Sequence, residues 1–271
     1  MVFAAALVIP ALLATAAFAA PSRDIRMANR LARRRAGGAH QGRPIDKIGV
    51  AGANATGTPE YSTNWSGVVY NEPQGTFTSV TGTFVVPTPQ VPDDSSSSGG
   101  DGSYSASAWV GIDGDSCSNA ILQTGVDFTV DDSGDVSYDA WYEWYPDYAY
   151  DFSGIDISAG DTITVTVTAS STTKGKAIIE NVSSGQTVTK SLTSSSALCE
   201  QDAEWIVEDY EEGSSLVPLA NFGSVTFTDA TAATSSGPLG PSGANVIDLK
   251  QNNVVYTSVE TTSDGVTISY V

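Results

Sequence analysis

The sequence predicts an all-β fold, a sandwich of two antiparallel sheets, on three observations. From about residue 60 onward, short runs rich in Val, Thr, Tyr and Trp alternate with clusters of Gly, Ser, Asp and Asn, which is typical of strands joined by tight turns. No long helical pattern is apparent in the same region. About a dozen strands bury their apolar faces most simply as two packed sheets, and nothing after residue 60 marks a second domain.

Thirteen strands are expected, each bounded by turn-forming residues. The turns are the glycine-containing clusters 131–135, 183–185 and 263–265, and the Ser- and Gly-rich run 92–103 is expected to be a surface loop. The strands should cover residues 63–70, 76–86, 105–112, 119–130, 136–146, 161–169, 176–181, 186–192, 203–210, 223–228, 245–249, 253–260 and 265–271.

Residues 1–20 are expected to form a secretory signal peptide. They are small and apolar, and they end in Ala17-Phe18-Ala19-Ala20, an A-x-A-like cleavage pattern. A membrane anchor is the alternative, but the run is short for a spanning helix and is followed by polar residues. The protein is therefore expected to be secreted and extracellular, with no membrane partner.

Charge divides the rest of the chain into two parts. Residues 21–50 hold eight of the twelve Lys and Arg residues and two of the 31 acids, whereas residues 51–271 hold four lysines and 29 acids. The strongly acidic charge of residues 51–271 excludes a nucleic-acid partner, since phosphate binding needs clustered cations. The same composition suits a protein that is active at acidic pH. We expect residues 21–55 to be a basic pro-segment that inhibits an acidic domain, residues 56–271, at neutral pH. A basic arm for anionic surfaces is the alternative.

The two cysteines, Cys117 and Cys199, predict one disulfide, because an even pair in a secreted chain is normally bonded. Such a bond would close a long loop and stabilise the fold by ~3–5 kcal/mol in the chain-entropy model. Two buried free thiols are the alternative.

Histidine usage restricts the chemistry. His40 is the only histidine and lies in the expected pro-segment, which excludes Ser-His-Asp, Cys-His and His-rich zinc sites from the domain. No metal or cofactor is expected, and carboxylates are the expected general acids and bases.

Two short motifs resemble known sites. Asp132-Ser133-Gly134 resembles an aspartic protease triplet, but it occurs once among turn residues. The run 109–115 resembles a calcium loop but lacks the EF-hand spacing.

The stretch Ala203–Glu212 is the strongest candidate for this chemistry. It has strand composition, and alternation places Glu204, Ile206, Glu208 and Tyr210 on one face. An ionised carboxylate is costly to bury without partners, so two carboxylates on one face indicate more than packing. Periodicity alone does not rank Glu204 against Glu208.

Two other strands carry side chains suited to a binding cleft. Gln123 is polar in a mostly apolar strand, where it serves either as a hydrogen-bonded sheet residue or as an amide that stabilises a developing oxyanion. One face of a later strand carries both acidic and aromatic side chains, which suits either an amphipathic core strand or a peptide or carbohydrate cleft. These are Asp139, Trp141, Glu143 and Tyr145.

Four motifs, in this order, resemble the glutamic peptidases, or eqolisins. They are Trp109-Val-Gly-Ile-Asp-Gly-Asp115, Ile121-Leu-Gln-Thr-Gly125, Tyr138-Asp-Ala-Trp-Tyr-Glu-Trp-Tyr-Pro146 and Ala203-Glu-Trp-Ile-Val-Glu-Asp209. The likeness extends from Asn64 to Val271. It implies a secreted, acid-acting endopeptidase made as a prepro-protein, with a β-sandwich of the concanavalin A-like lectin/glucanase type.

The resemblance also assigns roles. Glu208 is expected to activate the attacking water and later protonate the leaving amine, while the amide of Gln123 stabilises the oxyanion. It also pairs the two cysteines. Glu204 is left either as a residue that supports the site from behind or as a solvated edge residue, and the solvated edge residue is the favoured expectation. The residues expected to line the substrate cleft are Trp65, Trp109, Asp113, Asp127, Asp139, Trp141 and Glu143.

Two other functions fit the same fold. A glycoside hydrolase would use two carboxylates, such as Glu143 and Glu208, with tryptophans for sugar stacking. A lectin-like module would bind carbohydrate without turnover. The favoured expectation is a monomeric peptidase that acts on protein or peptide substrates.

Overall fold

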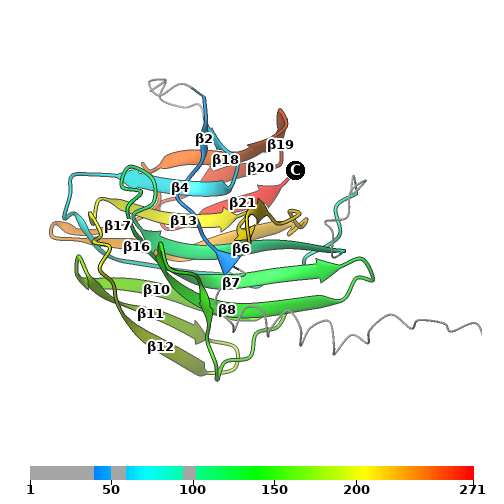
Figure 1. The fold of residues 1–271 in the computed structure, drawn as a ribbon, viewed down its shortest axis with the longest axis horizontal. Helices are drawn as coiled ribbons and strands as arrows, with labels where there is room; N and C mark the ends of the chain where they lie inside the picture. The colour runs from blue at the N-terminus through cyan, green and yellow to red at the C-terminus, as the bar shows by residue number, and fades with distance from the viewer. Residues whose placement is uncertain (1–39, 50–58, 94–101) are drawn as a thin grey trace, which may run out of the picture.

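The computed structural model describes residues 40–49, 59–93 and 102–271, and this part of the chain is all β, as predicted (Figure 1). The expected signal peptide, residues 1–20, and most of segment 21–55 lie outside the described residues. The described part contains no helix long and apolar enough to cross a membrane.

One large sheet has eight strands, in the order β12-β11-β10-β5-β16-β21-β20, with β17 paired to β16. All of its pairs are antiparallel. Its strands are β5 (Phe77–Val85), β10 (Thr162–Ser171), β11 (Lys174–Asn181), β12 (Gln186–Thr193), β16 (Ser224–Thr234), β17 (Gly237–Leu239), β20 (Thr257–Thr261) and β21 (Val266–Tyr270).

The other large sheet has ten strands, in the order β2-β3-β18-β4-β13-β6-β7-β8-β9, with β19 paired to β18. Its one parallel pair, β18 with β3, departs from the purely antiparallel expectation. The strands are β2 (Lys47–Ile48), β3 (Glu60–Ser62), β4 (Trp65–Asn71), β6 (Ser103–Ile112), β7 (Ile121–Asp131), β8 (Val136–Tyr145), β9 (Tyr150–Asp151), β13 (Asp202–Glu208), β18 (Asn245–Gln251) and β19 (Val254–Val255).

A third, small sheet joins the N-terminal part of the chain to the region after β13. Its strands are β1 (His40–Gln41), β14 (Glu211–Glu212) and β15 (Ser215–Leu216), and β1 pairs antiparallel with β14. Strands this short have no sequence periodicity of their own. They form here because distant backbone groups pair with one another.

Strand β10 shows how the sequence builds the eight-stranded sheet. Its threonines are half-buried, while Ile163, Val165 and Val167 are buried, so the apolar side chains all point to one face. On the opposite face the threonine hydroxyls of β10 form hydrogen bonds with those of β5, as between Thr81 and Thr166 at 2.7 Å. The alternation of threonine with apolar residues therefore fixes the strand register, and the apolar face of β10 covers one side of the core.

Apolar side chains lie on both faces of the ten-stranded sheet. The main core, which includes Phe84, Phe128 and Phe227, fills the space between the two sheets. A second cluster, which includes Trp109 and Trp141, lies on the outer face. In β6, β7 and β13 nearly every residue is buried, because other parts of the chain cover that outer face.

Three strand predictions need correction. The strand expected over 223–228 continues to Thr234, past an irregularity between Thr228 and Thr231 that interrupts its alternation. The strand expected over 203–210 ends at Glu208, so Tyr210 lies beyond it. The strand expected over 253–260 is two strands, β19 and β20, separated at Tyr256. The break arises because β19 pairs with β18 of the ten-stranded sheet, whereas β20 pairs with β21 of the eight-stranded sheet, so the chain changes sheets at Tyr256.

The predicted disulfide is present. Cys117 follows β6, and Cys199 precedes β13. The bond spans 82 residues of sequence, and it ties together the loops that flank two adjacent strands of the ten-stranded sheet.

Candidate active site

The outer face of the ten-stranded sheet brings residues from four adjacent strands together. In the register of β13, β6 and β7, Gly111 lies beside both Glu204 and Gln123. Gln123 in turn lies beside Glu143 of β8. Residues that lie directly opposite each other on neighbouring strands point to the same face, so the side chains of Gln123 and Glu143 lie on the same side of the sheet. We call this side of β13, β6, β7 and β8 the site face.

A second row crosses the site face four residues, or two strand repeats, further along. Ser107 of β6 lies beside Glu208 of β13 and beside Asp127 of β7. Asp127 in turn lies opposite Asp139 of β8. The prediction that Glu204, Ile206 and Glu208 share one face of their strand is confirmed by this register, which pairs each with a site-face position.

Glu208 is fully buried and held at both carboxylate oxygens. The indole nitrogen of Trp109 donates to Oε2 at 2.9 Å, and the backbone nitrogen of Arg43 donates to Oε1 at 3.1 Å. Trp65 packs edge-on against Trp109, with ring centroids 5.0 Å apart. Burial raises the pKa of Glu208 to about 8, although the hydrogen bonds from Arg43 and Trp109 oppose that rise.

Gln123 and Glu143 are in direct contact. The side-chain nitrogen of Gln123 donates to Oε2 of Glu143 at 3.2 Å, and the backbone nitrogen of Gly42 donates to the same oxygen at 2.9 Å. Burial raises the pKa of Glu143 well above its ordinary value, and the carboxylate of Glu208 adds to the effect. A Cβ atom on Gly42 would lie 2.5 Å from Gln123 Nε2, so a larger residue at this position would push the amide of Gln123 aside.

Asp127 has a partner that the sequence did not predict. Its Oδ2 lies 3.0 Å from Nδ1 of His40, and both side chains are buried. The imidazole stacks on Tyr210 at 4.1 Å between centroids and meets the edge of Trp141 at 4.9 Å. The single histidine of the chain thus fills a small pocket on the site face.

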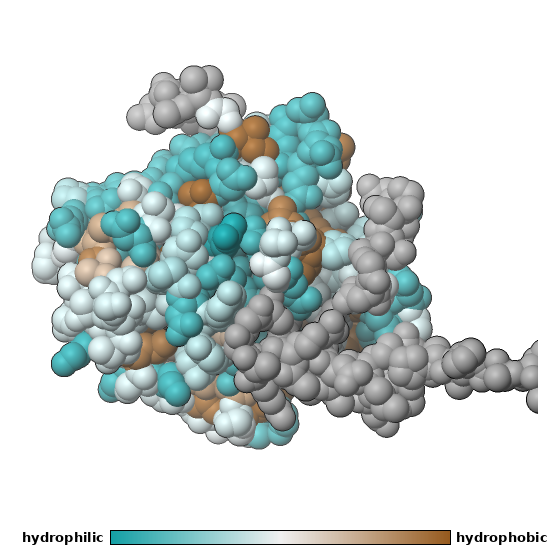
Figure 2. Space-filling view, in the orientation of Figure 1, coloured by the Kyte–Doolittle hydropathy of each residue, from teal (hydrophilic) through white to brown (hydrophobic). Residues whose placement is uncertain are grey.

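These contacts come from residues 40–48, which we call the N-terminal segment. Figure 1 shows it running from β1, near β7, across β6 and β13 to β2. Figure 2 shows this face of the molecule as mostly hydrophilic, with hydrophobic residues in separate patches. The segment belongs to the expected pro-segment. Its opposite charge predicted attraction to the domain, but charge alone did not predict a position directly over the predicted catalytic pair.

Backbone contacts fix the N-terminal segment on both sides of Glu208. On one side, β1 pairs with β14, and the nitrogen of Ala149 donates to the carbonyl of His40. On the other side, Ile45 donates to the carbonyl of Gly114 at 3.1 Å. The segment is therefore bound as an extended chain.

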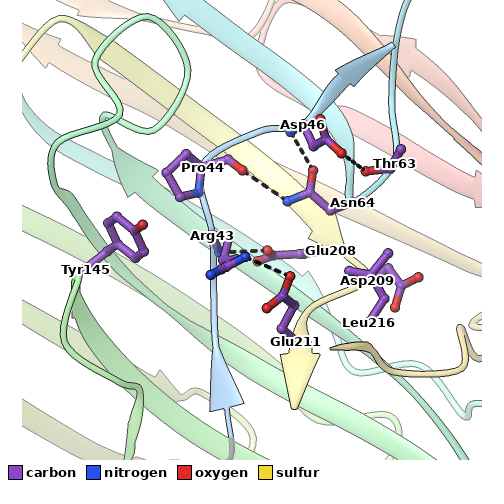
Figure 3. A pocket seen from close by; sticks show the side chains of 10 residues that line it. All are labelled: Arg43, Pro44, Asp46, Thr63, Asn64, Tyr145, Glu208, Asp209, Glu211 and Leu216. Carbon is purple, nitrogen blue, oxygen red and sulfur yellow. Dashed lines mark hydrogen bonds and ion pairs between the residues drawn. The ribbon is translucent and has the colours of Figure 1, made fainter. Parts of the chain in front are cut away.

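Side chains add further contacts along the segment. Asn64 accepts from the nitrogen of Asp46 at 2.8 Å and donates to the carbonyl of Pro44 (Figure 3). Arg43 forms an ion pair with Glu211 at 3.0 Å. Near the end of the segment, Lys47 forms ion pairs with Asp115 and Glu60, each at 2.8 Å.

A cavity of about 340 Å³ remains beside the segment. Figure 3 shows Tyr145 facing Arg43 across it, with Glu208 and Glu211 on the far side. The residues that line it are Arg43, Pro44, Asp46, Thr63, Asn64, Tyr145, Glu208, Asp209, Glu211 and Leu216.

Asp113 makes contacts unlike those of the other predicted cleft residues. Its two carboxylate oxygens accept four backbone N–H groups from residues 199–202, at 2.7 to 3.2 Å. Burial raises its pKa, and these hydrogen bonds counteract the rise. Asp113 therefore holds the loop that leads into β13, the strand that carries Glu208.

Glu204 is not the solvated edge residue that was expected. Its side chain is fully buried, and neither carboxylate oxygen has a hydrogen-bond partner in the described part of the chain. Burial raises its pKa well above the ordinary value, and the nearby charges of Asp202 and Asp113 raise it further. The expectation failed because β13 is covered on both faces.

Comparisons with known proteins identify the family to which the chain belongs. Residues 63–270 match the model of the peptidase A4 family. The chain is 49% identical to aspergillopepsin-2 of Aspergillus niger, over 96% of each chain, and 40% identical to scytalidopepsin B of Scytalidium lignicola, over the full length of both. It also resembles the crystal structure of scytalido-glutamic peptidase with a transition state analog inhibitor. That match has a TM-score of 0.68 and 42% identity, and it covers 77% of this chain and 98% of the other.

The family match covers more than half of the chain, and both relatives are aligned over nearly their whole length. A glycoside hydrolase or a lectin on the same sandwich is thereby disfavoured. The chain belongs to the peptidase A4 family, the eqolisins, and is a peptidase of the glutamic type.

Proposed function

We propose that this chain is the precursor of a secreted, acid-acting endopeptidase in which Glu208 and Gln123 perform the chemistry. One observation carries the proposal: consecutive residues of one extended segment contact the two groups. The nitrogen of Arg43 donates to Glu208, and Gly42 lies against the amide of Gln123. A peptide bond bound on this face is thus flanked by a carboxylate and an amide, which together suffice for hydrolysis assisted by general acid–base catalysis.

In the free enzyme, Glu208 acts first as a base. Trp109 occupies Oε2, which leaves Oε1 available to accept a proton from the attacking water. The amide of Gln123 donates to the oxygen that becomes negative as the tetrahedral intermediate forms. Glu208 then returns its proton to the leaving nitrogen, so one carboxyl group serves as base and acid in turn.

The acid working range follows from the burial of Glu208. Its pKa of about 8 belongs to the site covered by the N-terminal segment, where desolvation disfavours the charged form. When the segment leaves, water reaches Oε1, and the pKa falls toward the ordinary glutamate value of about 4.3. Glu208 is then ionised, as a general base must be, while the solution is still acidic.

We further propose that the N-terminal segment is the inhibitor of its own peptidase. It occupies Oε1 of Glu208 and carries three basic side chains that face carboxylates: His40 to Asp127, Arg43 to Glu211 and Lys47 to Asp115. Protonation of these carboxylates in acid removes the attraction. The segment should therefore hold at neutral pH and leave in acid. Substrates should then contact the predicted cleft residues Trp65, Asp127, Asp139 and Trp141.

Two substitutions test the catalytic assignment. Glu208→Gln should lower peptidase activity about 10²–10⁴-fold, and Gln123→Ala should lower it about 10²–10³-fold. The assay is mass spectrometry of a denatured protein incubated with the processed enzyme at about pH 3–4, a range set by the ordinary glutamate pKa. Thermal unfolding shows whether each variant is folded, and Glu180→Gln, at an exposed position of β11, is the matched control. Near-normal activity in either folded variant overturns the assignment.

A further inference from the structure

We propose that protonated Glu143 is the positioning residue for Gln123, the oxyanion donor, and that loss of this proton ends activity as the pH rises toward neutral. The inference rests on the proposed function and names the group that sets its upper pH limit. Glu208 alone cannot set that limit, because a general base stays ionised as the pH rises. An upper limit needs a second group that must hold a proton.

Gln123 and Glu143 each leave one oxygen unpaired. The two residues lie directly opposite each other on β7 and β8, and both side chains are fully buried. The Oε1 atom of each residue has no hydrogen-bond partner within the described part of the chain. Buried polar atoms are rarely left unsatisfied, so two such oxygens in one contacting pair require an explanation.

A single proton satisfies both oxygens. Oε2 of Glu143 already accepts two hydrogen bonds, from Nε2 of Gln123 at 3.2 Å and from the backbone nitrogen of Gly42 at 2.9 Å. The proton of a neutral Glu143 therefore belongs on Oε1, which then becomes a donor. The amide oxygen of Gln123 is the unpaired acceptor of the same pair, so the acid and the amide can join through two hydrogen bonds.

This two-point pair fixes the direction in which the amide of Gln123 faces. One of its N–H groups is used by Glu143, and the second remains available for the oxyanion. A hydrogen bond accepted at the amide oxygen also polarises the amide and strengthens its N–H donors. Ionised Glu143 has no proton to offer, so two acceptor oxygens would oppose each other and the amide would lose its fixed direction.

The surroundings of Glu143 favour the protonated form. Burial raises its pKa well above the ordinary value, although the hydrogen bond from Gly42 opposes the rise. Three carboxylates raise the pKa further, from elements on different sides: Glu208 of β13, Asp147 of the loop after β8 and Asp127 of β7. A fourth negative charge among them is disfavoured by repulsion.

The same preference should persist after the N-terminal segment has left. In the described part of the chain no basic group of the segment forms an ion pair with Glu143: His40 lies against Asp127, and Arg43 pairs with an acid outside this cluster. Departure of the segment admits water and lowers the cost of burial, but it takes no cation from Glu143. Ionised Glu208 then favours a proton on Glu143, so the two carboxyl groups hold different protonation states at one pH.

The test is the pH dependence of kcat and KM for the processed enzyme on a fluorogenic peptide. Glu143→Gln is the deciding variant, because a second amide offers one donor and one acceptor to Gln123 at every pH. It should lower kcat near pH 4, close to the ordinary glutamate pKa, by less than about tenfold. The neutral-side limb of its profile should move upward by about one pH unit or more, since an amide does not titrate.

Glu143→Leu is the matched variant, of similar size but without hydrogen-bonding groups. It should lower kcat by about 10²-fold or more, as expected for a misplaced oxyanion donor, with little change in KM. A purely structural role for Glu143 predicts equal losses in the two variants and an unmoved neutral-side limb, and either result overturns the proposal. Thermal unfolding shows whether each variant is folded; if Glu143→Leu is not, the limb of Glu143→Gln decides alone.

Gln123→Ala, measured in the same series, separates two failures. If Gln123→Ala stays active, the proposed function fails. If Gln123→Ala is inactive while the neutral-side limb of Glu143→Gln stays where it is in the unmodified enzyme, only this inference fails.

Discussion

The indole nitrogen of Trp109 donates a 2.9 Å hydrogen bond to Oε2 of Glu208 across two adjacent strands. The bond fixes which oxygen of the carboxylate faces the bound chain, and it favours the charged form of a buried glutamate. A tryptophan that the family resemblance assigned to the substrate cleft therefore also tunes the proposed general base.

Trp109→Phe should shift the pH dependence of the processed enzyme. Removal of the donor raises the pKa of Glu208, so the carboxylate form needed as the base appears at higher pH. The acid limb of the kcat/KM profile should move upward by about one pH unit, because a hydrogen bond to a charged group contributes about 1.5–3 kcal/mol and part of it is replaced by solvent.

Trp141→Phe is the control for this shift. The indole nitrogen of Trp141 donates to Ser107 at 3.0 Å and not to Glu208. This variant can lose activity through substrate contacts, but its acid limb should stay where it is in the unmodified enzyme. Equal shifts in both variants would show that the effect comes from general loosening of the aromatic cluster.

The N-terminal segment should depend more on its buried contact between His40 and Asp127 than on its more exposed ion pairs. His40→Ala removes this buried partner of Asp127 and the ring stacked on Tyr210, a loss of about 3 kcal/mol or more, so the initial activity of unprocessed precursor near pH 6 should rise by about 100-fold or more. Lys47→Ala removes two ion pairs of a partly exposed lysine, each worth about 0–1 kcal/mol, and should raise it less than about 30-fold. The measurement is the initial rate on a fluorogenic peptide, before processing. Similar effects of the two changes would argue that net charge, not the pocket around His40, holds the segment.

Most of the sandwich could be predicted from the sequence, because its long strands have a clear alternation of buried and exposed residues. In β10 the alternation of threonine with Ile163, Val165 and Val167 defines the strand, its buried face and its ends to within two residues. The face of β13 that carries Glu208 follows from the same periodicity. These features are local, and one strand is enough to display them.

The parts that could not be predicted depend on distant contacts. Strand β1 exists because His40 and Gln41 pair with residues 211 and 212, more than 160 positions away. Glu204 seemed suited to solvent, since carboxylates are rarely buried alone, but the cover over β13 removes the solvent. The choice of Glu208 over Glu204, and of Gln123 as its partner, came from family resemblance and not from periodicity.

Asp113 should prove to be a positioning residue for β13. Asp113→Asn replaces an acceptor oxygen with an N–H₂ group that faces backbone donors of residues 199–202. Two hydrogen bonds to a charged group are lost, so the free energy of unfolding should fall by about 3 kcal/mol or more, and the Tm by about 6–12 °C. Asp93→Asn, at an exposed position, is the control. An unchanged Tm would contradict this role.

Glu204 makes the stability of the fold depend on pH. Burial raises its pKa well above the ordinary value, so the folded state holds the proton more tightly than the unfolded chain does. The stability that this provides is fully present below the unfolded pKa of about 4.3, and it is lost as pH rises toward the folded pKa. Asp248, whose pKa burial raises to about 6, acts in the same direction.

Glu204→Gln should therefore flatten the dependence of Tm on pH. The amide is neutral throughout, so the variant should match or fall below the parent near pH 4 and exceed it near pH 7, by about 2–4 °C for each kcal/mol of ionisation cost removed. Both proteins should carry Glu208→Gln, because that change prevents self-digestion during heating. Glu180→Gln, on the exposed side of β11, should leave the profile unchanged. A Tm difference that is the same at both pH values would show that Glu204 is ionised, or solvated, in the folded protein.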